Sequence, residues 1–123
     1  MSTLKVTNIQ DSSGSNASTT EQINQGRAKV WCRWNGDGTA AINDSFNVSS
    51  LTDNGTGDFT VNFSTNMSNA NYSVGWIGGG GLIWNGDGTY ATTSSFRSLG
   101  MGRQDSYGLH DGSIWCVNIF GDQ

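Results

Sequence analysis

Strict alternation of apolar and polar residues between positions 58 and 64 is the feature that most limits the folds open to this chain. Its apolar positions are Phe59, Val61 and Phe63. Successive side chains of a β-strand point to opposite faces, so this pattern predicts a strand with one buried face. The pattern recurs in residues 27–34, 46–51 and 72–76, whereas Ile114–Phe120 is apolar on both faces. We therefore expect an all-β fold in which residues 114–120 form a central strand covered on both sides.

Glycine and asparagine separate the predicted strands, and the chain contains no proline. Residues 35–38, 53–57 and 85–88 supply the positive-φ positions that tight hairpin turns require. Short strands separated by such turns are typical of a β-sandwich. Five Trp, five Phe and three Tyr provide apolar area for a core, and no segment sustains a helical period for long. The sequence therefore predicts a small antiparallel β-sandwich.

The chain contains an internal repeat, because Trp34-Asn35-Gly36-Asp37-Gly38-Thr39 recurs at residues 84–89. The correspondence extends to Phe46 and Phe96. One interpretation is a pair of loops that bind sugar or calcium; the other is a single hairpin used twice, with Trp and Phe as core residues. The loop has too few carboxylates for an EF-hand-like calcium site. We favour the structural interpretation.

Charge and hydropathy exclude several classes of protein. The formal net charge is −4, and the six basic residues do not cluster, so the basic surface that nucleic-acid binding needs is missing. No run approaches the length of a membrane span, and residues 1–5 lack the apolar stretch of a signal peptide. We expect a soluble protein made in a cytoplasm, with no nucleic-acid partner and no membrane insertion.

The two cysteines, Cys32 and Cys116, each lie inside a predicted strand. They either form one disulfide or remain two buried thiols that act as small apolar side chains. Without an export signal we favour the free thiols. No His or further Cys stands at ligand spacing, so we expect no metal site.

Two segments differ from the rest in composition. Residues 1–26 are polar, with one short predicted strand at Leu4–Ile9, and we interpret them as an N-terminal arm, either a linker or a segment that orders by oligomerisation or on another chain; a β-sandwich domain follows at residues 27–123. Residues 98–112 are predicted to form a long loop. Loops of this length on a rigid β scaffold are where binding residues collect.

Catalytic residues are hard to find in this sequence. His110, beside Asp111, is the only candidate base, and no Gly-x-Ser-x-Gly elbow accompanies it. Most aspartates, including Asp37, Asp53 and Asp58, are interpreted as turn residues. The glycines at residues 78–81 lack the Lys-Ser/Thr of a phosphate loop. We expect no enzymatic activity and no cofactor.

Residues 46–63, which read Phe-Asn-Val-Ser-Ser-Leu-Thr-Asp-Asn-Gly-Thr-Gly-Asp-Phe-Thr-Val-Asn-Phe and are followed by Met67 and Asn71-Tyr72, carry a family resemblance. This block resembles one common in bacteriophage tail-fibre C-terminal domains, especially those of marine phages, including phages of cyanobacteria. Residues 28–31 and 34–36 are similar to the strand and turn that precede it, and residues 2–14 resemble the start of many short marine-phage structural proteins. The resemblance covers roughly residues 2–72 and carries no catalytic residue.

The resemblance implies a homotrimeric virion protein, assembled in the host cytoplasm, whose distal β domain meets the host surface. We expect a tail-fibre or receptor-binding tip that adheres non-covalently to a host glycan or protein, and that contacts other virion proteins through its arm. The expected ligand-binding residues are Arg103, Tyr107, His110, Asp111 and Tyr90. The alternative is a capsid decoration or head–tail accessory protein with an inert β domain. A third interpretation, a small glycan hydrolase, would require two converging acids.

Overall fold

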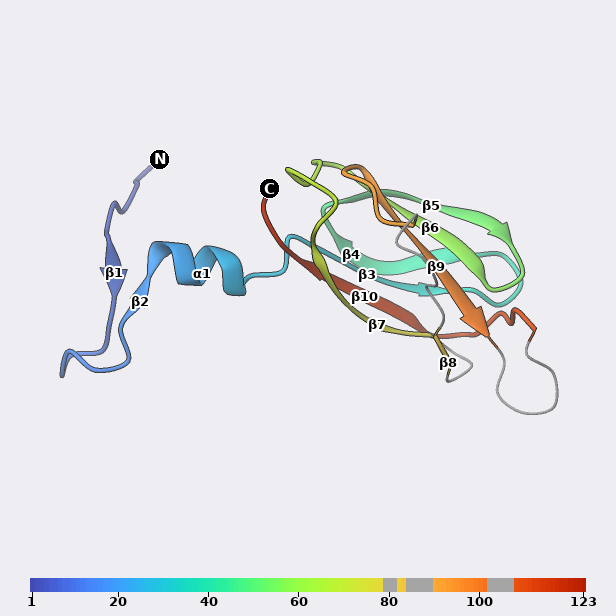
Figure 1. Cartoon of the computed structure of the whole chain (residues 1–123), viewed down its shortest axis with the longest axis horizontal. Coiled ribbons are helices and arrows are strands. Elements are labelled where there is room, and N and C mark those ends of the chain that lie inside the picture. The colour runs from blue at the N-terminus through green and yellow to red at the C-terminus, as the bar shows by residue number, and fades with distance from the viewer. Residues whose placement is uncertain (79–81, 84–89, 102–107) are drawn as a thin grey trace.

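The computed structural model describes residues 1–78, 82–83, 90–101 and 108–123, and over these residues it has ten strands and one short helix (Figure 1). The elements are β1 (Asn8–Ile9), β2 (Ser18–Thr19), α1 (Thr20–Gly26), β3 (Val30–Asn35), β4 (Ala41–Phe46), β5 (Val48–Gly55), β6 (Asp58–Phe63), β7 (Ser73–Ile77), β8 (Leu82–Ile83), β9 (Ser95–Met101) and β10 (Trp115–Phe120). The named strands pair antiparallel, in one two-stranded and two four-stranded sheets. The expected all-β class is confirmed.

The first four-stranded sheet has the order β4-β3-β10-β7. Strands β3 and β4 form a hairpin through the turn predicted at residues 35–38. In β3, Val30, Cys32 and Trp34 are buried, while Trp31 and Arg33 are exposed. Local alternation therefore predicted both the strand and its buried face.

Strand β10 lies between β3 and β7, as its apolar sequence predicted. Only one of its faces is fully covered, however. Trp115, Val117 and Ile119 are buried, but Asn118 is exposed and Phe120 is half-buried. The expectation that β10 is covered on both sides is wrong, because no described element lies over the outer face at Asn118.

The second four-stranded sheet has the order β5-β6-β9-β8. Strands β5 and β6 form the hairpin predicted around residues 53–57. The segment expected to be a loop, residues 98–112, begins instead inside β9, which continues to Met101. Asp58 is likewise the first residue of β6 and not a turn residue.

Both four-stranded sheets contribute to one hydrophobic core, whose centre is aromatic. The indole of Trp115, from the first sheet, lies with its ring centroid 5.7 Å from that of Trp34 and 5.0 Å from the ring of Phe59, which comes from the second sheet. Glycines make room for this ring: a Cβ at Gly36 would lie 2.7 Å from its Nε1, and one at Gly100 would lie 2.1 Å from the ring. The absence of side chains at these glycines therefore leaves the space that the Trp115 ring needs in a close-packed core.

Asn47 is the corner at which the chain passes from one sheet to the other. Strand β4 ends at Phe46 and β5 begins at Val48, so the strand predicted at residues 46–51 is divided between two sheets. Asn47 adopts a left-handed conformation with φ 57°, which asparagine tolerates better than most residues. Its side chain accepts from the Thr65 backbone N–H at 2.7 Å and donates to the Lys29 carbonyl oxygen at 3.2 Å.

Residues 84–89 of the second repeat copy lie outside the described residues, and the parts of the two copies that can be compared, residues 41–46 and 91–96, do not fold alike. Residues 41–46 form the continuous strand β4, whereas Ala91 forms an isolated antiparallel bridge to Phe96, so this stretch of the second copy turns back on itself. The Thr92 hydroxyl oxygen accepts from the backbone N–H of Ser94 at 3.2 Å and of Ser95 at 2.9 Å. Such local bonds compete with strand pairing. Phe96 is buried but Phe46 is 52% exposed, so Phe46 is not a core residue.

We call the two four-stranded sheets, β3 to β10, the β body. The N-terminal arm contains β1, β2 and α1 and extends away from this body (Figure 1). Strand β1 covers only Asn8–Ile9 of the strand expected at residues 4–9. Helix α1 starts with a capping box, in which Thr19 Oγ1 accepts from the Gln22 backbone N–H at 3.1 Å and Gln22 Oε1 accepts from the Thr19 N–H at 2.8 Å. No residue of this helix is buried, and it is not a helix that could cross a membrane.

Candidate functional site

The end of the β body farthest from the arm is held together by backbone hydrogen bonds between loops from both sheets. We call residues 35–38, 55–57 and 108–113 the distal end. The Gly36 N–H donates to the Gly112 carbonyl oxygen at 2.8 Å, and the His110 N–H donates to the Gly100 carbonyl oxygen at 2.9 Å. The segment before β10 is therefore fixed to the first hairpin turn and to β9.

Asp111, an expected ligand-binding residue, has a structural contact at the distal end. Its Oδ1 accepts from the Gly57 backbone N–H at 2.7 Å, and the residue is half-buried. A carboxylate that accepts a backbone N–H makes a charge-assisted hydrogen bond of the stronger kind. Asp111 thus connects the β5–β6 turn to the segment that carries His110.

Gly57 is required at this contact for two physical reasons. Its φ is +65°, which disfavours any residue with a Cβ, and a Cβ there would lie 2.6 Å from His110 N and 2.7 Å from Gly100 O. Those neighbours are backbone atoms and cannot rotate away. The Gly-Thr-Gly sequence of the turn therefore lets the segment around His110 approach the second sheet closely.

His110 and Leu109 present their side chains at the surface of the distal end. Both residues are exposed, and the backbone of His110 is fixed by its bond to Gly100. A fixed backbone with an exposed imidazole and an adjacent apolar side chain is suited to contacting a ligand. Two further expected binding residues, Arg103 and Tyr107, lie outside the described residues.

Tyr90 is placed differently, beside the middle of β9. The Arg97 backbone N–H donates to the Tyr90 carbonyl oxygen at 2.9 Å, and the Arg97 guanidinium carbon lies 5.3 Å from the centroid of the Tyr90 ring. This is the geometry of a cation–π contact. Tyr90 is half-buried, so part of the residue is open to solvent.

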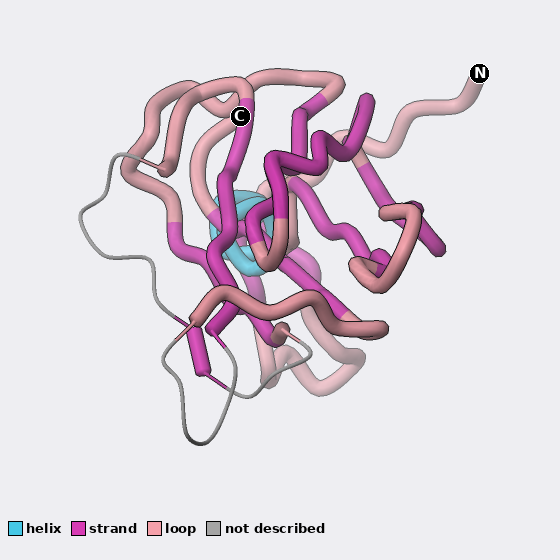
Figure 2. The backbone as a smooth tube through the Cα atoms, turned by 90° about the vertical axis from the view of Figure 1, so that its right-hand side faces the viewer, coloured by secondary structure: helices cyan, strands magenta, loops and turns pink. Residues whose placement is uncertain are grey.

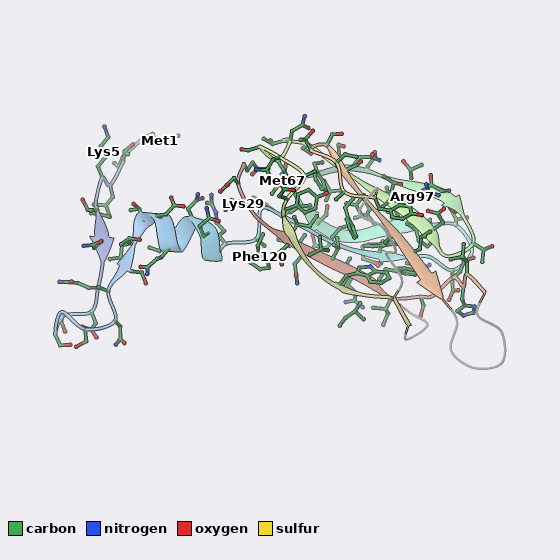
Figure 3. The ribbon with its side chains drawn as sticks, in the orientation of Figure 1. Met1, Lys5, Lys29, Met67, Arg97 and Phe120 are labelled. Atoms are coloured by element: carbon green, nitrogen blue, oxygen red, sulfur yellow. The ribbon has the colours of Figure 1, made fainter. Side chains whose placement is uncertain are left out.

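Arg97 and Asp58 form an ion pair that the sequence analysis did not identify. Arg97 Nε donates to Asp58 Oδ1 at 2.8 Å and Arg97 Nη2 donates to Asp58 Oδ2, so the pair is bidentate (Figure 3 labels Arg97). The pKa of Asp58 is lowered, chiefly because Arg97 donates to its carboxylate. The signal present in the sequence was weak: each residue adjoins a buried phenylalanine and occupies a polar position in a strand.

The polar cluster extends from this ion pair onto β5. Asn54 Nδ2 donates to Asp58 Oδ1 at 3.2 Å and to Thr60 Oγ1 at 2.8 Å. Further along the sheet, Asn62 Nδ2 donates to the hydroxyl oxygens of Ser50 and Thr52, each at 3.0 Å. These contacts order the outward-facing polar side chains of β5 and β6 into a row of amides and hydroxyls, which is connected to Tyr90 through Asp58 and Arg97.

The structure brings His110 and Asp111 together at the distal end and places Tyr90 at a separate position along the same sheet. The Tyr90 carbonyl oxygen accepts from Arg97 and the His110 N–H donates to Gly100, so the two attachment points on β9 are three residue steps apart. At about 3.4 Å per strand residue, that is roughly 10 Å. An oligosaccharide is long enough to cover this distance and could contact both the polar row and the distal end.

Two acids of the candidate site, Asp58 and Asp111, already have hydrogen-bond partners. Asp58 accepts from Arg97 Nε at 2.8 Å, and Asp111 accepts from the Gly57 N–H at 2.7 Å. In the part of the chain that the structure describes, no three His, Cys, Asp or Glu residues are grouped to hold a metal ion. Comparison of the chain with protein-family models, curated proteins and solved structures finds no match.

Proposed function

We propose that the chain is a structural adhesion protein of a bacteriophage virion, the tip of a tail fibre, which binds a host-surface glycan through its distal end without chemical turnover. The family resemblance of residues 46–63 suggests the class of protein. A glycan fits the available groups, because aromatic faces stack on the apolar faces of sugars while amides, hydroxyls and guanidinium groups bond their hydroxyls.

The observation that carries this proposal is the placement of arm and distal end at opposite ends of one long axis (Figure 1). Figure 2 looks along that axis from the distal side and has helix α1 behind the β body. A fibre tip needs this polarity, with attachment at one end and recognition at the other. His110 is exposed at the recognition end, and Tyr90 lies on the way to it.

The proposal includes a β-sandwich body and a homotrimeric assembly. Two four-stranded sheets that share one core support the sandwich. Three copies would present three distal ends in parallel, and simultaneous contacts would give adhesion even where each single contact is weak. The expected mass in solution is about 39 kDa, three times the 13.1 kDa of one chain.

The test is binding of the purified protein to an array of bacterial surface oligosaccharides. The variants are His110→Ala and Tyr90→Ala, and Asn43→Ala, an exposed position in β4, is the matched control. We expect each site variant to weaken binding at least tenfold and the control to leave it unchanged. Absence of binding to any array member, or equal binding by all variants, would reject the distal end as the adhesion site. Release of shortened sugars during incubation would favour the hydrolase.

A second candidate function, a capsid decoration or head–tail accessory protein, is favoured by one observation. Helix α1 buries none of its residues, as expected of an arm that is ordered by another virion protein. In that case the β body would bind no glycan, and hydrogen exchange of residues 20–26 would slow only on the assembled particle. The array and this exchange measurement separate the two functions.

A further inference from the structure

An aromatic cluster is exposed on the outer face of the β4-β3-β10-β7 sheet, at the end nearest the arm. Phe46 lies directly opposite Trp31 in the strand register, and Trp31 lies opposite Asn118, two residues before Phe120. All three aromatic residues therefore share the outer face. Trp31 is 38% exposed and Phe46 52%, while Phe120 is half-buried. We call Trp31, Phe46 and Phe120 the aromatic patch.

The arm also carries apolar side chains that are exposed to solvent. Leu4 is 82% exposed, Ile9 54%, Ile23 42% and Val6 40%. A helix of seven residues and a ribbon with strands of two residues each are too short to be stable in water by themselves. The arm therefore needs an apolar surface on which to pack.

The arm cannot reach the patch of its own chain without breaking the contacts at its base. Gln25 Nε2 donates to Asp122 Oδ1 at 2.7 Å, and the buried Lys29 donates through Nζ to the carbonyl oxygen of Asn24 at the end of α1. Figure 3 labels Lys29 and Phe120 at this junction, with α1 directed away from the body. Helix α1 spans about 10 Å and separates the body from Leu4, Val6 and Ile9, which precede the helix in the chain and therefore lie beyond the body.

The area of the patch also favours an arm over a flat contact between two bodies. With 150–250 Å² for a whole buried aromatic side chain, Trp31 and Phe46 leave on the order of 200 Å² exposed. A stable interface buries about 800 Å² on each partner. The patch by itself is too small, but a patch covered by the arm of a neighbour, with the reciprocal contact repeated around a closed assembly, approaches that size.

We propose that the arm of one copy packs through Leu4, Val6 and Ile9 onto the aromatic patch of a neighbouring copy. The arm and the patch would then form the interface of the homo-oligomer proposed above. This contact rests on that proposed assembly but not on glycan binding. Because both arm and patch lie at the same end of the body, exchange of arms leaves the distal ends of all copies free.

The first test is the solution mass of the full chain by light scattering after size exclusion at about 100 μM. We expect at least twice the 13.1 kDa of one chain. The arm variant, Leu4→Ser with Val6→Ser, and the patch variant, Phe46→Ser, should each weaken association at least tenfold. Ile114→Ser removes an apolar side chain of similar exposure, 47%, just before β10 and serves as the control.

Mixing the two variants then tests whether the arm of one copy contacts the patch of another copy. The patch variant retains an intact arm and the arm variant an intact patch, so the mixture should form heteromeric complexes that neither forms alone. A monomeric native protein, an arm variant that still associates, or a mixture that stays monomeric would each overturn the proposal. Circular dichroism confirms that the variants fold. An assembled protein that binds no glycan would reject the adhesion role and leave this contact standing.

Discussion

Asp58 and Arg97 join strands β6 and β9 through a bidentate ion pair on the outer face of the second sheet. The Asp58 side chain is only 10% exposed, whereas that of Arg97 is 44% exposed. Tyr90 lies against the guanidinium, and Asn54 donates to the same carboxylate. The pair is thus the centre of the polar cluster beside the candidate site, and its contribution to stability has a definite dependence on pH.

Asp58→Asn should lower the free energy of unfolding at pH 7 by about 1 kcal/mol, because solvent at the Arg97 end screens the pair. The pKa of Asp58 lies below its usual 3.8, so the carboxylate's contribution is complete above pH 4 and is lost as the pH falls through the lowered value. Urea unfolding should therefore show a constant difference from the native protein between pH 5 and 7, and a shrinking one below about pH 4. Asp37→Asn, at an exposed turn, is the control; a difference that does not shrink as the pH falls below 4 would contradict the assignment.

Gly57→Ala and Gly38→Ala separate backbone strain from close approach. Both glycines have nearly the same φ, +65° and +66°, but a Cβ at Gly38 meets nothing within 4 Å, whereas one at Gly57 meets His110 N at 2.6 Å. We expect Gly38→Ala to cost about 1–2 kcal/mol from strain alone, and Gly57→Ala about 1–3 kcal/mol more from overpacking. Thermal unfolding measures both. Equal losses would mean that the distal segment moves away from Gly57 without cost.

Cys32 and Cys116 should react differently with a thiol reagent. Both thiols are free, as the sequence analysis favoured. Cys32 pairs with Val117 in the strand register, so Cys32 and Cys116 occupy adjacent, opposite-facing positions and face different sides of the sheet. Burial raises the pKa of Cys32 to about 12. At pH 8 we expect one thiol, that of Cys116, to react fast, and Cys116→Ser should remove this reaction. The Cys32 thiol should react only when the protein unfolds. Two fast equivalents, or none without a reductant, would contradict this arrangement.

Lys29→Met tests the base of the arm. Lys29 is buried and donates to the carbonyl oxygen of Asn24 at the end of α1, where a cation stabilises the helix. Loss of one such hydrogen bond costs about 1 kcal/mol, which corresponds to roughly fivefold faster hydrogen exchange in residues 20–26. Lys5→Met, at an exposed position, should leave the exchange unchanged. Unaltered exchange in Lys29→Met would show that the contact does not hold the helix.

Most strands could be predicted from the sequence, because the alternation that identifies them is local. Residues 58–63 and 30–35 form strands with the expected faces buried, and the turns at residues 35–38 and 53–57 connect hairpins. Helix α1 was missed because seven residues are too few to show a helical period, although Thr19 and Gln22 have the spacing of a capping box. The repeat did not predict that residues 41–46 and 91–96 fold differently, because the matching positions carry Ile-Asn-Asp in one copy and Thr-Thr-Ser in the other.

The candidate site could be predicted only in part. The sequence singled out His110, which is exposed at the distal end, and Asp111, whose role in ligand binding stays a prediction, but it treated Asp58 as a turn residue. Asp111 accepts from Gly57, which precedes it by 54 residues, and Arg97 follows Asp58 by 39. Neither contact leaves a local pattern in the chain.

By itself, the sequence determined the all-β class, the position of most strands and the face that each one buries, because these follow from side-chain alternation over a few residues. Only the tertiary structure decided which strands pair and in what register, and therefore which polar groups meet. Strand β10 lies between β3 and β7 because of long-range pairing, and this pairing exposes Trp31, Phe46 and Phe120 on one outer face. Register sets such juxtapositions, and it is a property of two strands together that neither encodes alone.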